Sequence, residues 1–414
     1  MSFEKSLQIS IILATPPGFN AGMLVTELGL VAFLKRHNFL PHAHFYRLLE
    51  FEDRLKGLAE NDLKDLGRRV SIGIASKSAV EEYGSIIESD AILYWADFLH
   101  MAQYLRALQN VCSWHFSDEK AAGLPEKIFL LSEASDETLS KTLTFATTML
   151  FNTIEDDLSP GYAKNINRFL TNVRRVWVRD ALSASRVSHI RQDYRTGYFG
   201  VDAALLLRRE DLVEDTALIT SPPVTLIFFG RDPSLYDKLQ TLALHLATAR
   251  GSSLEWLPWG DNRAFPFLGP RTSQLAIDEG ATIYELLGAL KRATLVVTDT
   301  YHLAVTAWNF GVPAICTFQG QGGALPDVSA GRPFNWRDKR ELFFSQYDAL
   351  DFMIRPEETS DMTLLDRRTE HILAQLKNKV LIDSIIQRIH AHAKYAEEDL
   401  ATELRSLMHR EDPL

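Results

Sequence analysis

Short runs of continuous apolar residues alternate with helical patterns along most of this chain, and that alternation restricts the folds open to it. In the first half, buried strands are predicted over residues 7–14, 91–95, 127–131 and 176–178. A strand that is apolar on both faces needs cover on both, which parallel sheets with βαβ crossovers provide. The first half is therefore predicted to be a doubly wound α/β unit.

The second half of the chain repeats this pattern. Strands are predicted over residues 224–229, 254–257, 294–297 and 314–318, with helices over 233–249, 282–291 and 302–310. Glycines and a Pro-Pro pair within residues 191–223 indicate the crossing between two units.

The fold class predicted is α/β, with two Rossmann-like doubly wound domains that face a cleft. We expect an N-terminal domain over 1–200, a second domain over 201–350, and a helical tail over 351–414 that packs back on the first domain. In such sheets, ligands bind outside the carboxyl ends of the strands.

Charge and composition exclude several functions. The 414 residues carry a net charge of −10, which disfavours binding to nucleic acid, and 46% are hydrophobic, as in globular proteins. Two distant cysteines, Cys112 and Cys316, form neither a disulfide framework nor a metal-ligand spacing. No run reaches the roughly 18 apolar residues of a membrane span. A cytoplasmic protein is expected, with peripheral contact at the inner face of a membrane left open; oligomeric state is undetermined.

Two loops that follow predicted strands of the first domain carry candidate binding residues. In residues 15–22, Gly18 allows close backbone approach, and Asn20 can cap a helix whose N-terminus attracts an anion. Arg179 follows another strand and precedes the capping residue Asp180, so it is placed to reach the cleft. The alternatives are a plain strand-to-helix turn and a surface arginine beside a cap.

Two loops of the second domain are more informative. Arg231 comes directly after Gly230 at a strand end, and its guanidinium suits phosphate or carboxylate, although it could instead form a salt bridge across the loop. Asp299 and Thr300 are capping residues, and His302 falls in the first turn of the next helix. There a histidine can bind phosphate or act as a general acid, or it can be structural.

The ordered set of motifs resembles the polysaccharide pyruvyl transferase family over about residues 8–320. The motifs are the Asn-x-Gly loop at Asn20, SDAILYW, VWVRDALSASRV, GVDAALLL, IFFGRDP, LEWLPWG and VTDTYHLAVTAWNFGVPAI. The resemblance implies a GT-B-like fold and transfer of the carboxyvinyl unit of phosphoenolpyruvate onto sugar hydroxyls of a cell-surface polysaccharide or its precursor. It implies no cofactor and no metal, with the acceptor on the first domain and the donor on the second.

The resemblance also implies roles for individual residues. Arg179, Arg231 and His302 are the candidates for donor binding and catalysis. The residues expected to bind substrate are Gly18, Asn20, Asp299, Thr300, Tyr301, Trp259 and Arg263, with Trp259 and Tyr301 as platforms for the sugar. Glu27 and Asp97 are weaker candidates for a base near the acceptor.

Two positions depart from the family pattern. Thr300-Tyr301-His302 stands where the family usually has Arg-Leu-His, and Met23 replaces an aspartate of the Asn-x-Gly-Asp loop. The chain thus lacks the donor-binding arginine, whose charge Arg231, Arg263 or Arg271 could supply. Two alternatives follow: a glycosyltransferase that uses a nucleotide-sugar donor, or a non-catalytic member with a degenerate site. The acceptor is expected to be a carbohydrate, lipid-linked or free.

Overall fold

The computed structural model describes most of the chain. The described residues are 7–14, 20–48, 74–150, 159–193, 198–212, 222–230, 235–260, 281–317 and 338–408.

The first sheet has six parallel strands in the order β3-β2-β1-β4-β5-β6. Its strands are β1 (Ile9–Leu13), β2 (Ala43–Arg47), β3 (Lys77–Ser78), β4 (Ala91–Asp97), β5 (Thr142–Thr147) and β6 (Arg175–Val178). The helices around it are α1 (Ala21–Arg36), η1 (Leu40–His42), α4 (Tyr83–Glu88), α5 (Ala102–His115), α6 (Asp118–Ala121), α7 (Leu124–Phe129), α8 (Asp136–Ser140), α10 (Pro160–Asn172) and α11 (Ala181–Arg191). This strand order is that of a dinucleotide-binding Rossmann sheet, with its reversal between β1 and β4.

The second sheet has five parallel strands in the order β11-β10-β9-β7-β8. Its strands are β7 (Val224–Phe228), β8 (Ser253–Trp256), β9 (Ala293–Thr298), β10 (Ala314–Thr317) and β11 (Met353–Ile354). Short turns η3 (Ala203–Leu206) and η4 (Arg209–Asp211) precede it. The helices are α12 (Tyr236–Ala249), α13 (Ile283–Arg292), α14 (Tyr301–Asn309), α15 (Lys339–Gln346), η10 (Leu350–Phe352), α16 (Pro356–Ser360), α17 (Met362–Lys377) and α18 (Lys379–Met408).

The predicted α/β class, with two doubly wound sheets and a C-terminal helical region, is confirmed. The predicted strand over 127–131 is wrong, because this segment belongs largely to α7, which follows Gly123 in a left-handed conformation and has Pro125 in its first turn. The strand between β4 and β6 in the sheet is β5 instead, which the prediction missed together with β2, β3 and β11. The domain limits at 200 and 350 remain predictions.

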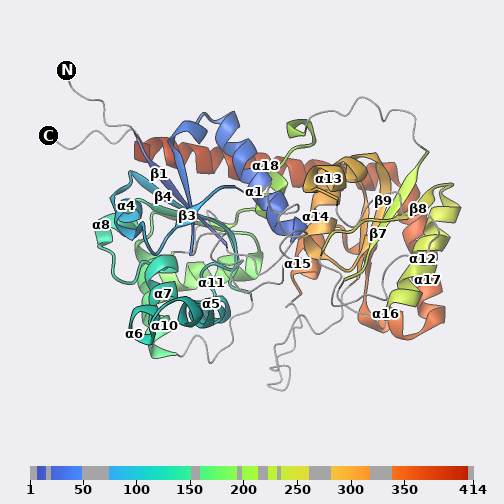
Figure 1. The fold of residues 1–414 in the computed structure, drawn as a ribbon. Helices are drawn as coiled ribbons and strands as arrows, with labels where there is room; N and C mark the ends of the chain where they lie inside the picture. The colour runs from blue at the N-terminus through green and yellow to red at the C-terminus, as the bar shows by residue number, and fades with distance from the viewer. Residues whose placement is uncertain are drawn as a thin grey trace.

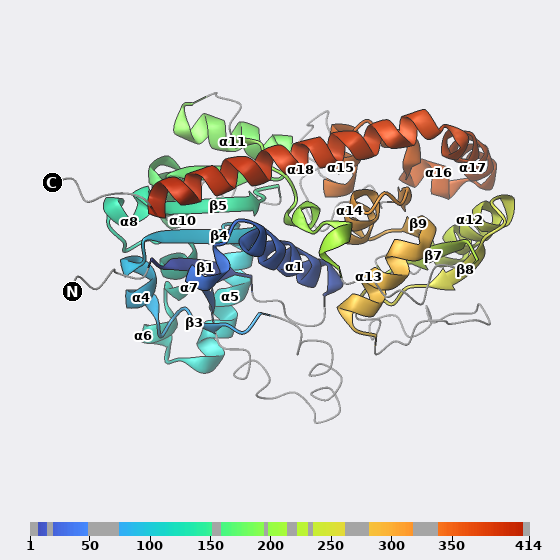
Figure 2. The same ribbon diagram turned by 90° about the horizontal axis from the view of Figure 1, so that it is seen from above.

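One long helix, α18, runs along both sheets (Figures 1 and 2). In its first half, His390 Nε2 lies 2.8 Å from the carbonyl oxygen of Asn309 in α14. Near its end, Asp399 accepts hydrogen bonds from Trp177 at 2.8 Å and Arg175 at 2.9 Å, both on β6. The same helix therefore contacts both halves of the chain. None of the described helices is long and apolar enough to cross a membrane.

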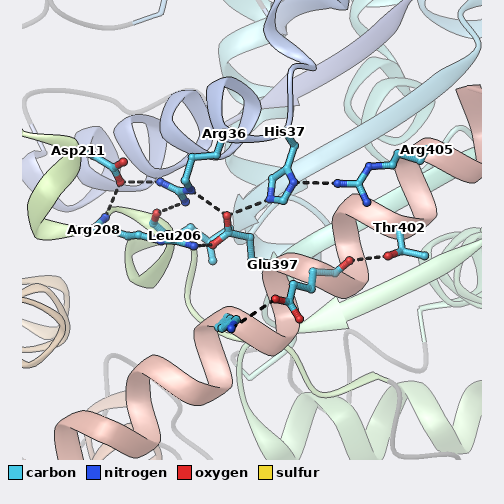
Figure 3. Close-up of polar contacts among 10 residues, drawn as sticks. Arg36, His37, Leu206, Arg208, Asp211, Glu397, Thr402 and Arg405 are labelled. Atoms are coloured by element: carbon cyan, nitrogen blue, oxygen red, sulfur yellow. Dashed lines mark hydrogen bonds and ion pairs between the residues drawn. The ribbon is translucent and has the colours of Figure 1, made fainter.

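Glu397 of α18 is the centre of an ion-pair cluster that joins this helix to α1 and to the segment after η3 (Figure 3). Its carboxylate accepts hydrogen bonds from Arg36 and Arg208, both at 2.9 Å, and lies 3.0 Å from His37 Nε2. Burial would raise the pKa of Glu397, but the bonds from Arg36 and Arg208 outweigh it and hold the pKa below its ordinary value. The carboxylate is thus charged at neutral pH.

We expect Glu397→Gln to lower the free energy of unfolding at pH 7 by about 2–3 kcal/mol, since two arginines lose their shared carboxylate. A carboxylate with a lowered folded-state pKa stabilises the protein above its unfolded-state pKa, roughly 4.3, and this contribution is lost as pH falls below that value. The difference in the free energy of unfolding between wild type and variant, measured by urea unfolding, should therefore be smaller at pH 4 than at pH 7.

Glu398→Gln is the matched control, because Glu398 is the next residue and its pair with Lys394 is exposed on both sides, at 63% and 71%. Its loss should change stability by less than about 0.5 kcal/mol. Equal effects of the two substitutions would show that the Glu397 cluster does not stabilise the fold.

Candidate active site

In each sheet the strand order reverses at one position. The helices that follow the strands at these two positions, α1 and α14, contact each other. In the first sheet the reversal lies beside β1, which precedes α1; in the second it lies between β7 and β9, and β9 precedes α14. Figures 1 and 2 place the start of α1 beside α14 at the junction of the two halves. Ligands of open α/β sheets bind at such reversals, outside the carboxyl ends of the strands.

The N-terminus of α1 packs directly on His302. Asn20 is its N-cap, as predicted, and its side chain accepts a hydrogen bond from the Met23 amide at 3.3 Å. Asn20 also forms an antiparallel bridge with Gly260, which follows β8. A Cβ atom on Gly22 would lie 2.5 Å from Nδ1 of His302, so glycine is required for the helix to approach this imidazole.

Arg179, Asp202 and His302 form a buried charged cluster at this junction. The Oδ2 atom of Asp202 accepts a hydrogen bond from Arg179 Nη1 at 3.3 Å. The same atom lies 3.6 Å from His302 Nε2. The three residues are only 5%, 3% and 7% exposed. Two of the three predicted catalytic residues are therefore brought together, from the ends of β6 and β9.

Asp202 reaches this position because it caps η3, which packs between α1 and α14. Its Oδ1 accepts a hydrogen bond from the Ala204 amide at 2.9 Å. Burial would raise the pKa of Asp202, but the charge of the nearby His302 and the charge of Arg179 hold it well below its usual range. Asp202 is thus a carboxylate at neutral pH. It was not among the predicted site residues, although the aspartate of VDAALLL was a marker of the family resemblance.

Tyr301 lies under two cations. Its ring centroid is 5.2 Å from the guanidinium carbon of Arg179 and 4.9 Å from Nζ of Lys339. Burial, followed by the negative charge of Asp202, raises the pKa of Tyr301 well above its ordinary value, so the hydroxyl stays neutral. The ring is buried between these groups. Tyr301 is 6% exposed, and its predicted role as a platform for the sugar stays a prediction.

Asp299 holds the ends of β7 and β9 together. Its Oδ1 accepts a hydrogen bond from the Gly230 amide at 2.9 Å, and its carbonyl oxygen accepts one from Arg340 at 2.6 Å. Thr300 is the N-cap of α14, but its side chain does not bond to the helix amides; it donates to Asp299 instead, at 3.1 Å. These contacts fix the turn that presents His302.

Of the other predicted residues, those that the structure describes do not join the cluster. Trp259 is 2% exposed, and within the described part of the chain its Nε1 has no hydrogen-bond partner. Glu27 is buried in an ion pair with Arg47 at 2.7 Å, which leaves its carboxylate engaged. The side chain of Asp97 is not described. Gly18, Arg231, Arg263 and Arg271 lie outside the described residues.

Backbone strain also marks the carboxyl edge of the first sheet. Ala96 and Ala146 adopt positive φ values of 64° and 59°. They lie side by side, between the pairs Trp95–Phe145 and Asp97–Thr147 of β4 and β5. Non-glycine residues seldom adopt this conformation, and such strain gathers near functional sites. Phe98 follows β4 directly, and its ring centroid lies 5.5 Å from the guanidinium carbon of Arg179.

Among the described residues, no group of three or more His, Cys, Asp or Glu side chains could hold a metal ion. The chemistry available to the cluster is proton transfer by the imidazole and binding of an anion by the cations around it.

Two parallel sheets and a C-terminal helical region define a GT-B-like α/β fold, and solved structures share it. A putative UDP-N-acetylglucosamine 2-epimerase from Listeria monocytogenes superposes with a TM-score of 0.54 at 12% identity, covering 99% of this chain and 98% of that one. The UDP-GlcNAc 2-epimerase from Neisseria meningitidis bound to UDP-GlcNAc gives 0.51 at 10% identity, over 97% and 100% of the two chains. At such low identity these similarities concern the fold alone.

The sequence itself narrows the class further. Residues 44–317 match the polysaccharide pyruvyl transferase family. This match covers more than half of the chain, and the chain belongs to that family. Among curated proteins, none matches the sequence significantly.

Proposed function

We propose that the protein transfers the carboxyvinyl unit of phosphoenolpyruvate to hydroxyls of a sugar in a cell-surface polysaccharide or its precursor. The observation that carries the proposal is the buried cluster of Arg179, Asp202 and His302 at the start of α14. It combines an imidazole, the proposed proton donor, with a guanidinium, in a chain of a transferase family.

The reaction fits these groups. Phosphoenolpyruvate carries a phosphate and a carboxylate, which need cations in a site poor in water. A proton is delivered to the methylene carbon, and a sugar hydroxyl attacks the oxocarbenium-like centre that forms. Phosphate then leaves with the electron pair of its C–O bond, and a second hydroxyl closes the cyclic ketal, each hydroxyl releasing a proton. In this scheme His302 supplies the first proton, and Arg179 binds the donor's negative charge.

A nucleotide-sugar donor is the second candidate. The absence of the family's arginine at Thr300 favours it, and one of the similar folds is described with UDP-GlcNAc bound. In this version the same junction would bind the diphosphate, and the protein would be a glycosyltransferase. A non-catalytic role is the third, and it predicts that no donor binds.

The organisation that goes with the proposal assigns the acceptor to residues 1–200 and the donor to 201–350. Of residues 351–414, β11 belongs to the second sheet and α18 contacts both halves. The acceptor would be a carbohydrate, lipid-linked or free, used in the cytoplasm or at the inner face of a membrane. No nucleic acid is expected as a partner, because the net charge is −10.

A melting-temperature panel tests the donor. At a hundredfold excess over Kd, a ligand that binds only the native state adds about 2.7 kcal/mol of stability. We expect phosphoenolpyruvate to raise the melting temperature and pyruvate at equal ionic strength to leave it unchanged. A rise with UDP-GlcNAc alone would favour the glycosyltransferase, and no rise with either would favour the non-catalytic alternative.

A further inference from the structure

We infer that one hydrogen bond, from the Tyr347 hydroxyl to His392, positions the Asp202–His302 pair, so that Tyr347 is a positioning residue of the candidate active site. The bond joins the end of α15 to α18, the long helix that contacts both halves of the chain. Its two ends lead to the two members of the pair by separate routes. The inference rests on the proposed function for the reaction that is measured, but not for the structural link itself.

The hydrogen bond is buried, and its surroundings set its direction. Tyr347 is buried, and its hydroxyl oxygen lies 3.0 Å from Nδ1 of His392. Gln346 Nε2, which can only donate, lies 3.0 Å from the same oxygen and 3.3 Å from Nδ1. The Tyr347 oxygen therefore accepts from Gln346 and donates its own hydrogen to Nδ1. Burial lowers the pKa of His392 below its ordinary value, so the imidazole is neutral at neutral pH and Nδ1 can accept.

One route runs through aromatic rings to His302. The Tyr347 ring meets the Phe343 ring edge to face, with centroids 5.0 Å apart. Phe343 meets Tyr301 in the same geometry at 6.1 Å, and Tyr301 directly precedes His302 in the first turn of α14. All three rings are buried. Because packed side chains cannot move independently, a shift of Tyr347 would displace the start of α14.

The other route runs through Phe199 to Asp202. The His392 ring lies 5.1 Å from the Phe199 ring. Phe199 forms a parallel bridge with Val178 at the end of β6, and the Gly200 amide donates to the Val178 carbonyl at 2.7 Å. Asp202 follows two positions later and caps η3. The His392 ring thus packs against the short segment, bonded to β6, that presents Asp202.

Tyr347 also lies near Asp202 in space. Burial raises the pKa of Tyr347 well above its ordinary value, and the negative charge of Asp202 raises it further. The hydroxyl therefore stays protonated and remains a donor to His392. The carboxylate and the hydrogen bond that we infer to position it belong to one buried region.

Tyr347→Phe tests the inference, because it removes the hydroxyl and keeps the ring against Phe343. We expect kcat to fall about threefold to tenfold, as for the loss of one neutral hydrogen bond, with donor Kd unchanged. In the Asp202→Asn background the same substitution should lower kcat no further, because the contact that it positions is already lost. Tyr94→Phe is the matched control: it also removes a buried hydroxyl, bonded to the Ile128 carbonyl in α7, and should leave kcat unchanged.

Amide hydrogen exchange gives a second readout that needs no activity. The Ala204 amide donates to Asp202 Oδ1 at 2.9 Å, so exchange in residues 199–206 reports how firmly this segment is held. We expect Tyr347→Phe to accelerate that exchange about threefold to tenfold. His392→Phe keeps an aromatic ring but removes the acceptor, so it should have the same effect. Combining the two substitutions should then add nothing.

The outcomes separate the inference from the proposed function. Unchanged exchange in Tyr347→Phe would overturn the inference. Faster exchange with unchanged kcat in an active enzyme would also overturn it, since the bond would then only stabilise the fold, and so would an additive loss of kcat in the Asp202→Asn background. If wild type transfers nothing from phosphoenolpyruvate but exchange accelerates as expected, the proposed function fails and the link between Tyr347 and the Asp202 segment holds.

Discussion

Replacing His302 with asparagine should lower kcat by roughly 10²–10⁴-fold while donor binding survives, the loss typical of removing a general acid. The imidazole lies at the start of α14, packed under Gly22 and 3.6 Å from the Asp202 carboxylate. Asparagine keeps some hydrogen-bonding capacity but cannot deliver a proton near neutral pH. Measuring kcat, donor Kd and melting temperature on this one variant separates three roles for His302, namely general acid, phosphate ligand and structural residue.

The three roles give different patterns. If His302 only binds phosphate, donor affinity falls and kcat recovers at high donor concentration. If it is structural, melting temperature falls and activity per folded molecule is near normal, which would remove it from the site. His100→Asn is the control, because burial lowers the pKa of His100 to about 4 and its Nδ1 is bonded to the Phe129 carbonyl. That substitution should cost stability without a change in kcat.

Asp202→Asn should have the second largest effect, on stability and turnover together. Asparagine can keep the cap on η3, but it removes the carboxylate that pairs with the buried Arg179 guanidinium. When a buried ion pair loses one partner, the free energy of unfolding falls by about 3–5 kcal/mol. We also expect kcat to fall by about tenfold or more, because His302 loses the group that orients it. Donor affinity should not weaken, since the substitution removes a negative charge.

The pH dependence has a definite sign. The folded-state pKa of Asp202 is lowered, so its contribution to stability is present above the unfolded-state pKa, roughly 3.9, and disappears as pH falls below it. The gap in unfolding free energy between wild type and Asp202→Asn should therefore narrow from pH 7 toward pH 3. Asp211→Asn is the control, because Asp211 also pairs with an arginine, Arg36 at 2.6 Å, away from His302. A stability loss with unchanged kcat in both variants would make Asp202 purely structural.

Much of the fold was predictable because its strands are apolar on both faces. Residues 9–13 and 224–228 are fully buried, as parallel strands under helices must be. The same signal failed at residues 127–131, because a short apolar run can equally be one turn of a buried helix. It missed β5, whose threonines are buried; Thr142, for example, donates its hydroxyl hydrogen to the Thr138 carbonyl.

The site was predictable only where a residue follows a strand. Arg179 and His302 have that position, and they meet in space. Asp202 caps a short turn, and Lys339 begins a helix 37 positions after His302 along the chain. Their proximity depends on how the two sheets pack, for which local spacing carries no signal. Family motifs alone pointed to Asp202, and nothing in the sequence pointed to Lys339.

The contacts of α18 with β6 affect the order in which the chain can complete its structure during translation. Trp177 and its hydrogen-bond partner Asp399 are 222 residues apart. At about 5–20 residues per second, the ribosome needs roughly 10–45 s to synthesise that interval. The first sheet can form meanwhile, but the face that α18 covers stays open to water and to other chains until the helix emerges. We therefore expect nascent chains of this protein to expose, until late in synthesis, the apolar surface that α18 covers.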